Sequence, residues 1–291
     1  MGHEMNDTCK VISVINMKGG VGKTTLTKEL GYFMSDRKGK KILFIDLDPQ
    51  SNLTQSFFLH FGLRHSEDLN DQSSNTQITD ASIQNLFDAS VIKDLSLDKI
   101  IQSFETTRGG SFDLIPGTLS TIFLERSSNA SNMEKSIYNF IDNHELRNVY
   151  DYIFIDCPPT YSVYTIAALL PSDFYFVPVE PGIYSVLGIQ MLEKVVSSIK
   201  EPNAVFFKDK PLKNLGVVFT RYKEESGYLV DMIVESNKLN EMGIYFFKEH
   251  FLNSKKLIDR PNYFISEHDD TRLTDSLENI VAEMEERING L

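Results

Sequence analysis

The chain has 291 residues, and its 29 basic and 41 acidic side chains leave a formal net charge of −12. This length suits one large α/β domain or two smaller ones, and the acidic balance by itself argues against a nucleic-acid-binding protein. Two cysteines cannot form a disulfide framework, and no apolar run is long enough to span a membrane. We expect a cytoplasmic protein with a flexible leader at 1–9 and a single domain over 10–291.

Apolar, β-rich runs alternate with helical patterns along the chain. Most runs are continuous rather than alternating, which is typical of parallel strands covered on both faces. The predicted strands are 10–16, 41–48, 112–117, 152–159, 173–181, 214–222 and 243–247. Repeated strand–helix–strand units predict a doubly wound, mainly parallel α/β sheet with helices on both faces.

Helical patterns fill most of the segments between these strands. The first is closed by Gly39, and short helices are predicted at 82–88 and 97–104. A longer helix at 184–200 has apolar residues at i,i+4 spacing, namely Ile183, Leu187, Met191, Val195 and Ile199. Residues 63–82 are rich in Ser, Asn, Asp and Gln without an apolar period, and predict a long, mobile, polar surface loop.

A glycine-rich turn, "MKGGVGKTT" (17–25), lies between the first strand and the first helix. Its glycines let backbone N–H groups close around a polyphosphate at the helix N-terminus, so the turn is typical of a P-loop. Lys23 is placed to reach the β and γ phosphates, and the Thr24 hydroxyl to bind Mg²⁺. Met17 departs from the common pattern, which begins with glycine. The predicted nucleotide contacts are Gly19, Gly20, Val21, Gly22, Lys23, Thr24 and Thr25.

Acidic residues end two of the predicted strands. In "FIDLDPQSN" (44–52), Asp46 and Asp48 are two residues apart, and we expect their side chains to point to opposite faces of the sheet. One can then face the phosphates while the other orients its surroundings. In "YIFIDCPP" (152–159), four apolar residues precede Asp156, which is typical of a Walker B aspartate that binds Mg²⁺ through water.

Four motifs in this order, "KGGVGKTT", "FIDLDPQSN", "YIFIDCPP" and "VPVEPGIYSVLG", resemble the ParA family of deviant-Walker partition ATPases, which is related to Soj and MinD. The resemblance covers the chain apart from the leader and the polar loop. It implies the short class without an N-terminal helix-turn-helix domain. A closer likeness to the delta-type plasmid ParA of Gram-positive bacteria implies a small ribbon–helix–helix partner.

The resemblance also implies roles for individual residues. Lys18 crosses the interface of an ATP-sandwich homodimer to the partner's phosphates, where such a cation is worth a factor of about 10³–10⁵ in rate if it acts as arginine fingers do. Lys23 and Asp48 complete the catalytic set, with Asp48 positioning the attacking water and Asp46 in support as a further nucleotide contact. Thr24 and Asp156, the latter through water, hold Mg²⁺. The base lies near Thr220 and Arg221.

The family further implies non-specific binding of double-stranded DNA in the ATP state, association with the nucleoid, and stimulation of hydrolysis by a ParB-class centromere-binding protein. Residues 200–260 carry 11 basic and 9 acidic side chains, a net charge of +2, against the acidic remainder. Within "FLNSKKLIDRP" (251–261), the predicted DNA contacts are Lys255, Lys256 and Arg260. An exposed charged loop without DNA contacts is the alternative interpretation.

Three rival functions have distinct sequence requirements. A MinD-like membrane-cycling ATPase needs a basic amphipathic anchor, whereas the predicted last helix, "DTRLTDSLENIVAEMEERING" (270–290), combines an apolar stripe with an acidic polar face. A reductase like the nitrogenase iron protein needs paired cysteines at the dimer axis, and only Cys157 could serve, because Cys9 precedes the first strand. An ATP-dependent synthetase needs a pocket for a small substrate, which no motif marks.

Overall fold

The computed structural model describes residues 9–66, 76–88, 95–121 and 130–291. Its central feature is a seven-stranded sheet in the order β5-β6-β2-β7-β1-β8-β9, in which all neighbours pair in parallel except β5 with β6. The strands are β1 (Lys10–Val14), β2 (Ile42–Asp46), β5 (Gln102–Glu105), β6 (Ser111–Ile115), β7 (Tyr152–Asp156), β8 (Phe174–Val179) and β9 (Lys213–Phe219). The doubly wound α/β class predicted from the sequence is confirmed.

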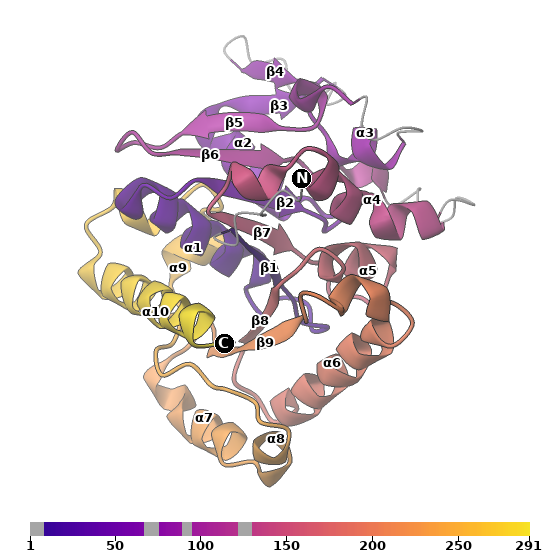
Figure 1. The fold of residues 1–291 in the computed structure, drawn as a ribbon. Coiled ribbons are helices and arrows are strands. Elements are labelled where there is room, and N and C mark those ends of the chain that lie inside the picture. The colour runs from indigo at the N-terminus through magenta and orange to yellow at the C-terminus, as the bar shows by residue number, and fades with distance from the viewer. Residues whose placement is uncertain (1–8, 67–75, 89–94, 122–129) are drawn as a thin grey trace.

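Helices cover both faces of this sheet (Figure 1). They are α1 (Lys23–Lys38), α2 (Asn52–Phe61), α3 (Ile83–Phe87), α4 (Ala130–Asn143), α5 (Val163–Leu169), α6 (Ser185–Lys200), α7 (Gly227–Val234), α8 (Asn237–Glu241), α9 (Lys255–Asp259) and α10 (Thr271–Gly290). One apolar core joins the sheet to α4–α8, and the other joins it to α1, α2, α9 and α10. The chain therefore forms three layers, with the sheet in the middle.

Close packing of α1 on β2 depends on a small residue. A Cβ atom on Gly31 would lie 2.4 Å from Cζ of Phe44, so no larger side chain fits without moving the helix. On the same face of the sheet, α10 buries the apolar stripe predicted for it, including Leu277, Ile280 and Val281. Within the described parts of the chain, no helix is both long and apolar enough to cross a membrane.

The central strand β1 lies between β7 and β8, so the turn after β1 is flanked by the ends of two neighbours. After β1 the chain passes to β2, on one side of β1. After β7 it crosses β1 and forms β8 on the other side. Such a reversal of strand order opens a crevice at the carboxyl edge of a parallel sheet. The glycine-rich turn, Asp46, Asp156 and Glu180 all follow strand ends at this edge.

Several predicted elements differ from the structure. Residues 243–247 hold one isolated bridge, between Phe246 and Val217, rather than a strand, although Phe247 is buried as an apolar run predicts. The helix predicted at 97–104 is a single 3₁₀ turn followed by β5, because an antiparallel pairing with β6 competes with the helical pattern. At 97–104, tertiary pairing overrides a short local pattern.

The predicted polar loop and leader also differ in part. Residues 63–82 begin and end with short strands, β3 (Leu63–His65) and β4 (Gln77–Thr79), which pair with each other in parallel; 67–75 lie outside the described residues. Of the predicted leader, 1–8 lie outside the described residues, and Cys9 is buried in the core rather than part of a flexible segment.

Helix α6 buries a different stripe from the predicted one. Its buried side chains are Ile189, Leu192, Val196 and Ile199, whereas Ile183, Leu187 and Met191 are 76%, 55% and 55% exposed. Each four-residue step along a helix turns by about 40° beyond a full turn, so four such steps rotate a stripe by about 160°. The predicted stripe therefore starts at the surface and ends in the core.

Candidate nucleotide-binding site

The turn after β1 has the backbone conformation of an anion-binding loop. Gly20 and Gly22 have φ values of +75° and +84°, which only glycine adopts readily, and Gly22 caps α1. The Asn16 side chain supports the start of the loop by accepting from the Lys18 N–H at 2.9 Å and donating to the Pro178 carbonyl at 2.8 Å. The loop thus presents its backbone N–H groups at the N-terminus of α1.

Thr24 and Asp156 meet at the base of this loop. The Thr24 hydroxyl donates to Oδ2 of Asp156 at 2.7 Å, while Oδ1 of Asp156 is buried without a hydrogen-bond partner. Burial, reinforced by the neighbouring Asp46 carboxylate, raises the pKa of Asp156. Burial also lowers the pKa of the Lys23 ammonium, against the attraction of Asp156. These groups are strongly desolvated, so a cation or polyphosphate at this place interacts with them at close range and with little screening by water or salt.

The arrangement fits a hard divalent cation beside a nucleotide. An unpartnered buried carboxylate oxygen and an adjacent hydroxyl are the oxygen donors that Mg²⁺ prefers. In the described part of the chain, no cluster of three or more His, Cys, Asp and Glu side chains is arranged to hold a metal ion alone. A cation bound at Thr24 and Asp156 would therefore take most of its ligands from phosphates and water.

Asp46 and Asp48 face different surroundings. Residues two apart within one strand would share a face, but β2 ends at Asp46, so its alternation does not extend to Asp48. Asp48 lines the cavity, where its Oδ1 accepts from the Gln50 N–H at 2.9 Å. Asp46 is fully buried, and its Oδ2 accepts from both the N–H and the hydroxyl of Thr54, at 2.9 and 2.7 Å. Burial raises the pKa of Asp46 to about 7, against these hydrogen bonds. Asp46 was predicted to contact the nucleotide; instead it fixes the first turn of α2.

A cavity of about 650 Å³ opens over the loop. Its lining includes Arg221 and the segment 251–254, together with the predicted residues Gly19, Gly20, Gly22, Lys23, Thr24, Thr25 and Asp48. The segment 251–254 was not predicted to contact a nucleotide. It has no phosphate-binding signature, and only the tertiary fold carries it to the loop, where the Phe251 N–H bonds to the Phe219 carbonyl at the end of β9.

Thr220 and Arg221, which were predicted to lie near the nucleotide base, have different surroundings. The buried Thr220 hydroxyl donates to the Val21 carbonyl at 2.6 Å, so it braces the phosphate loop, and Val21 itself is buried. Arg221 is exposed at the cavity rim and has a φ of +50°. This left-handed backbone is unusual for a residue other than glycine and turns the chain at the end of β9.

Lys18 does not line the cavity that Lys23 lines. Its side chain is 61% exposed, and its Nζ lies 3.7 Å from Oε2 of Glu180, which follows β8. Lys23 is only 6% exposed, and its Nζ donates to the Lys18 carbonyl at 3.3 Å. The two lysines of the loop thus occupy different environments, one in the site and the other at the surface beside it.

The predicted DNA contacts lie on and just after α9. Lys255 and Arg260 are exposed. Lys256 is half-exposed, but its Nζ pairs with Oδ2 of Asp270 at 2.9 Å and lies over the Tyr263 ring. Ser254 caps α9 by accepting from the Lys256 N–H. Because Asp270 offsets one of the three charges, the free positive charge of this segment is concentrated on Lys255 and Arg260.

Comparisons with known proteins agree with this geometry. A family model described as "AAA domain" matches residues 9–208, the part of the chain that holds the loop, Asp48 and Asp156. An uncharacterised protein of Methanocaldococcus jannaschii is 33% identical over 217 residues, which cover 74% of each chain. The sporulation initiation inhibitor protein Soj of Bacillus subtilis is 29% identical over 192 residues, covering 66% of each chain.

Solved structures share the fold. The ATP complex of a Cyanothece McdA variant superposes with a TM-score of 0.70 at 22% identity, covering 95% of this chain and 96% of McdA. At this level of identity the similarity concerns the arrangement of strands and helices. It shows that most of the chain follows one known architecture.

Proposed function

Because the chain belongs to the ParA-type P-loop ATPases, the family that its four motifs resemble, we propose that it is a partition ATPase that couples slow ATP turnover to dimerisation and DNA binding. The observation that carries this proposal is the separation of the two loop lysines. Lys23, Thr24 and Asp48 line one cavity, and the buried Asp156 accepts a hydrogen bond from Thr24, while Lys18 lies at the surface beside the cavity. A lysine in that place is available to a nucleotide bound by a second copy.

The site residues have complementary roles in this proposal. The loop backbone and Lys23 bind the β and γ phosphates of ATP, and Thr24 with Asp156 holds Mg²⁺, which supplies charge neutralisation at the phosphates when bound. Asp48, at the cavity wall, orients the attacking water. Lys18 of the second copy offsets the charge that develops on the transferred phosphoryl group. Hydrolysis then requires the dimer, and the dimer requires ATP.

An exposed apolar surface next to Lys18 supports the dimer. Beyond Glu180, the chain exposes Ile183, Tyr184, Leu187 and Met191 in the loop after β8 and along α6. β8 pairs with β1, so this surface continues directly from the phosphate loop. Large contiguous apolar side chains at a surface mark an interaction site. We propose that a second copy covers them in the ATP-bound dimer.

Non-specific DNA binding is the second part of the proposal. Lys255 and Arg260, with Lys256 in support, provide phosphate contacts, and dimerisation places two such segments on one duplex. The rest of the protein is acidic, so two weakly basic segments must contact the DNA together. The ATP-bound dimer brings them together, and DNA binding therefore requires ATP. A ParB-class protein, of the small ribbon–helix–helix type or another fold, binds the centromere and stimulates hydrolysis. In the cell the ATP-bound form associates with the nucleoid.

The purified chain tests these proposals directly. We expect a monomer with ADP and a dimer with ATP and Mg²⁺ by light scattering, and binding to unrelated duplexes with similar affinity only in the ATP state. EDTA should abolish both transitions. A monomer that hydrolyses ATP at full rate without self-association would contradict the proposal.

The rival functions make different predictions. In a MinD-like ATPase the last helix anchors to lipid, but α10 buries its apolar stripe against the sheet. Sedimentation with anionic vesicles should therefore leave the protein in the supernatant in both nucleotide states. In an iron–sulfur reductase a cysteine must reach the dimer axis, whereas Cys9 and Cys157 are both buried. Iron binding to the purified protein would favour that rival.

A further inference from the structure

The segment between α9 and α10 is docked on α1 by buried charges. We call residues 261–268 the strap. Lys28 of α1 donates from Nζ to the Pro261 carbonyl at 2.8 Å and to the Tyr263 carbonyl at 2.6 Å. The same Nζ pairs with Oε1 of Glu29 at 3.0 Å, and both side chains are almost completely buried. One ammonium group thus holds two strap carbonyls and one carboxylate.

Glu29 holds the next part of the strap. Its Oε2 accepts from the Ile265 N–H at 2.8 Å. Burial raises the pKa of the Glu29 carboxyl, and the adjacent Lys28 opposes that shift. Removing one partner of a buried ion pair leaves the other charge desolvated and uncompensated, which is far more costly than replacing both. The pair is therefore a strong constraint on the position of the strap relative to α1.

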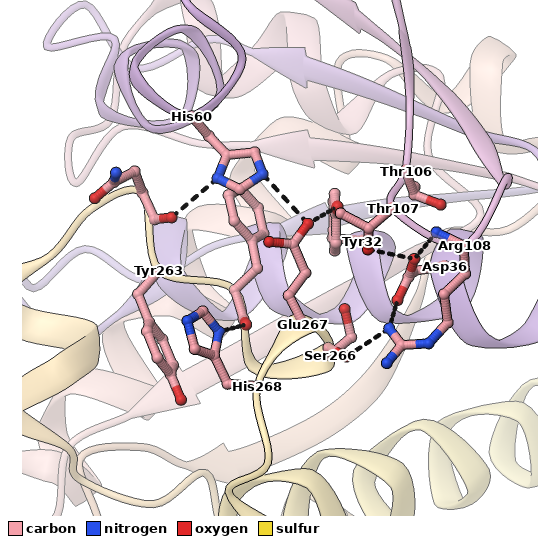
Figure 2. Close-up of polar contacts among 12 residues, drawn as sticks. Tyr32, Asp36, His60, Thr106, Thr107, Arg108, Tyr263, Ser266, Glu267 and His268 are labelled. Carbon is pink, nitrogen blue, oxygen red and sulfur yellow. Dashed lines mark hydrogen bonds and ion pairs between the residues drawn. The ribbon is translucent and has the colours of Figure 1, made fainter.

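The far half of the strap is held by a second set of contacts (Figure 2). Glu267 accepts from the Tyr32 hydroxyl, and its Oε1 lies 3.2 Å from Nε2 of His60 on α2. The Ser266 carbonyl accepts from Arg108 at 2.7 Å and from Arg37 at 2.6 Å. Arg108 also pairs with Asp36 of α1 at 2.6 Å. Contacts to α1 thus extend along the strap from Pro261 to Glu267.

These contacts join two surfaces that the proposed function uses. Helix α1 begins at the phosphate loop with Lys23 and Thr24, and Lys28 and Glu29 lie about one turn further along the same rigid helix. The strap directly follows α9 and Arg260, which carry the proposed DNA contacts. Of the strap residues, only Pro261 lines the nucleotide cavity, but Lys28 of α1 lines it too, so a nucleotide there lies beside the side chain that holds the strap. Leu257 and Ile258 of α9 line the same cavity.

We propose that Lys28 and Glu29 are positioning residues that couple the nucleotide site to the DNA-binding segment, because α1 keeps the strap docked and the strap fixes α9. A nucleotide that holds the start of α1 lowers the frequency with which the strap opens from the helix, and a docked strap presents Lys255 and Arg260 in a fixed arrangement. The coupling is reciprocal, so DNA at α9 favours nucleotide at the loop. This inference rests on the proposed function for its DNA-binding half only.

Amide hydrogen exchange of the strap tests the coupling without DNA. In the unaltered protein, a saturating non-hydrolysable ATP analogue should slow exchange in peptides covering 262–268 by a factor of about 5 to 150, the range of ordinary coupling free energies. In Lys28→Met, at an analogue concentration that saturates that variant, the slowing should disappear. A merely structural role would raise exchange with and without the analogue by the same factor and leave the ratio unchanged.

Lys38→Met is the matched control. Lys38 is on the same helix and pairs with Glu285 of α10 at 2.7 Å, but it has no contact with the strap among the interactions of the described residues. This variant should keep the full analogue-dependent slowing. If Lys28→Met fails to fold, Glu29→Gln provides the second test, because the amide keeps the shape and an acceptor for the Ile265 N–H. An unchanged ratio in the folded variant would overturn the inference.

A DNA arm separates this inference from the proposed function. With the ATP analogue, Lys28→Met should bind DNA at least 5-fold more weakly than Lys38→Met. If the unaltered protein binds no DNA, the proposed function fails, yet the exchange ratio still decides whether nucleotide and strap are coupled. If the unaltered protein binds DNA and Lys28→Met binds it equally well with the same exchange ratio, the coupling inference fails alone.

Discussion

The ammonium group of Lys23 donates a hydrogen bond to the backbone carbonyl of Lys18 at 3.3 Å, while the Lys18 side chain turns away toward Glu180. A hydrogen bond therefore links the Lys23 side chain, which lines the cavity, to the backbone of Lys18, whose side chain lies at the surface. A displacement of the Lys18 backbone would therefore change the environment of the Lys23 ammonium. This relationship gives the two lysines separable roles that mutation can distinguish.

Replacement of each lysine by alanine should give different losses. Lys23→Ala should abolish nucleotide binding, because its buried ammonium is the cation that the glycine-rich loop itself brings to the cavity. Lys18→Ala should bind ATP with nearly unchanged affinity as a monomer, but lose ATP-dependent dimerisation and partner-stimulated turnover. Fluorescent-nucleotide titration and light scattering measure the two properties. Equal loss of nucleotide binding in both variants would contradict a role for Lys18 in the second subunit.

Asp48→Ala should bind ATP and remain trapped as a dimer, because the phosphate contacts persist while the attacking water is no longer oriented. Turnover should fall by a factor of about 10² or more, as expected for loss of a general base or water-positioning group. Asp46→Asn is the comparison, since Asp46 contacts Thr54 rather than the cavity. It should chiefly lower the melting temperature. Turnover of Asp48→Ala at the rate of the unaltered protein would move the catalytic role elsewhere.

The apolar surface along α6 should be required for the dimer. Leu187→Asp places a charge where a second copy is proposed to pack, so ATP should no longer induce dimers, while monomeric ATP binding remains. Val205→Asp is the control, because Val205 is 77% exposed on a separate 3₁₀ turn after α6. Analytical ultracentrifugation with ATP and Mg²⁺ distinguishes the two. Normal dimers of Leu187→Asp would place the interface on another surface.

Salt dependence should separate the lysines of α9. Each phosphate neutralised contributes about 0.9 to the slope of log K against log salt, so Lys255→Ala in a dimer should lower the slope by up to about 1.8. Lys256→Ala should lower it less, because Asp270 already offsets this charge. Asp270→Asn should strengthen binding. The affinity changes should be similar on all sequences. Equal slopes for Lys255→Ala and the unaltered protein would locate the DNA surface elsewhere.

Asp36 should make the fold sensitive to acid. Burial acts to raise the pKa of this carboxyl, but hydrogen bonds from Thr106, Arg108 and Ser266 outweigh it and leave the pKa below its usual value. A depressed folded-state pKa stabilises the protein above the usual carboxyl pKa, and this contribution is lost as the pH falls through the depressed value. Asp36→Asn should therefore lower the melting temperature at pH 7, and the difference should shrink toward pH 3.

Calorimetry across this range checks the sign. Lys38→Met breaks an ion pair of α1 that does not involve the strap. The difference in melting temperature between this variant and the unaltered protein should not shrink in the pH range below the usual carboxyl pKa of aspartate. A difference between Asp36→Asn and the unaltered protein that stays constant from pH 7 to pH 3 would show that Asp36 stabilises the fold through shape alone.

The sequence by itself determined the class of the fold and the chemistry of the phosphate site. Continuous apolar strands, a glycine-rich turn and strand-end aspartates are local signals, because each depends on residues a few positions apart. These signals located Lys23, Thr24, Asp48 and Asp156 at the candidate site. The different surroundings of Asp46 and Asp48 follow from the end of β2 at Asp46, since residues two apart within one strand share a face. Short elements were less predictable: β5 depends on its pairing with β6, and no local pattern at 97–104 reveals that partner.

Only the tertiary structure decided which distant residues line the cavity beside the loop and what connects the loop to α9. Residues 251–254 reach the cavity because β9 ends beside it, and Lys28 and Glu29 look like ordinary surface charges of a helix until the strap is placed over them. Their burial depends on a segment more than 230 positions away. A buried charge is stabilised by the sum of its surroundings, which come from distant parts of the chain, so its role cannot be read from neighbouring residues.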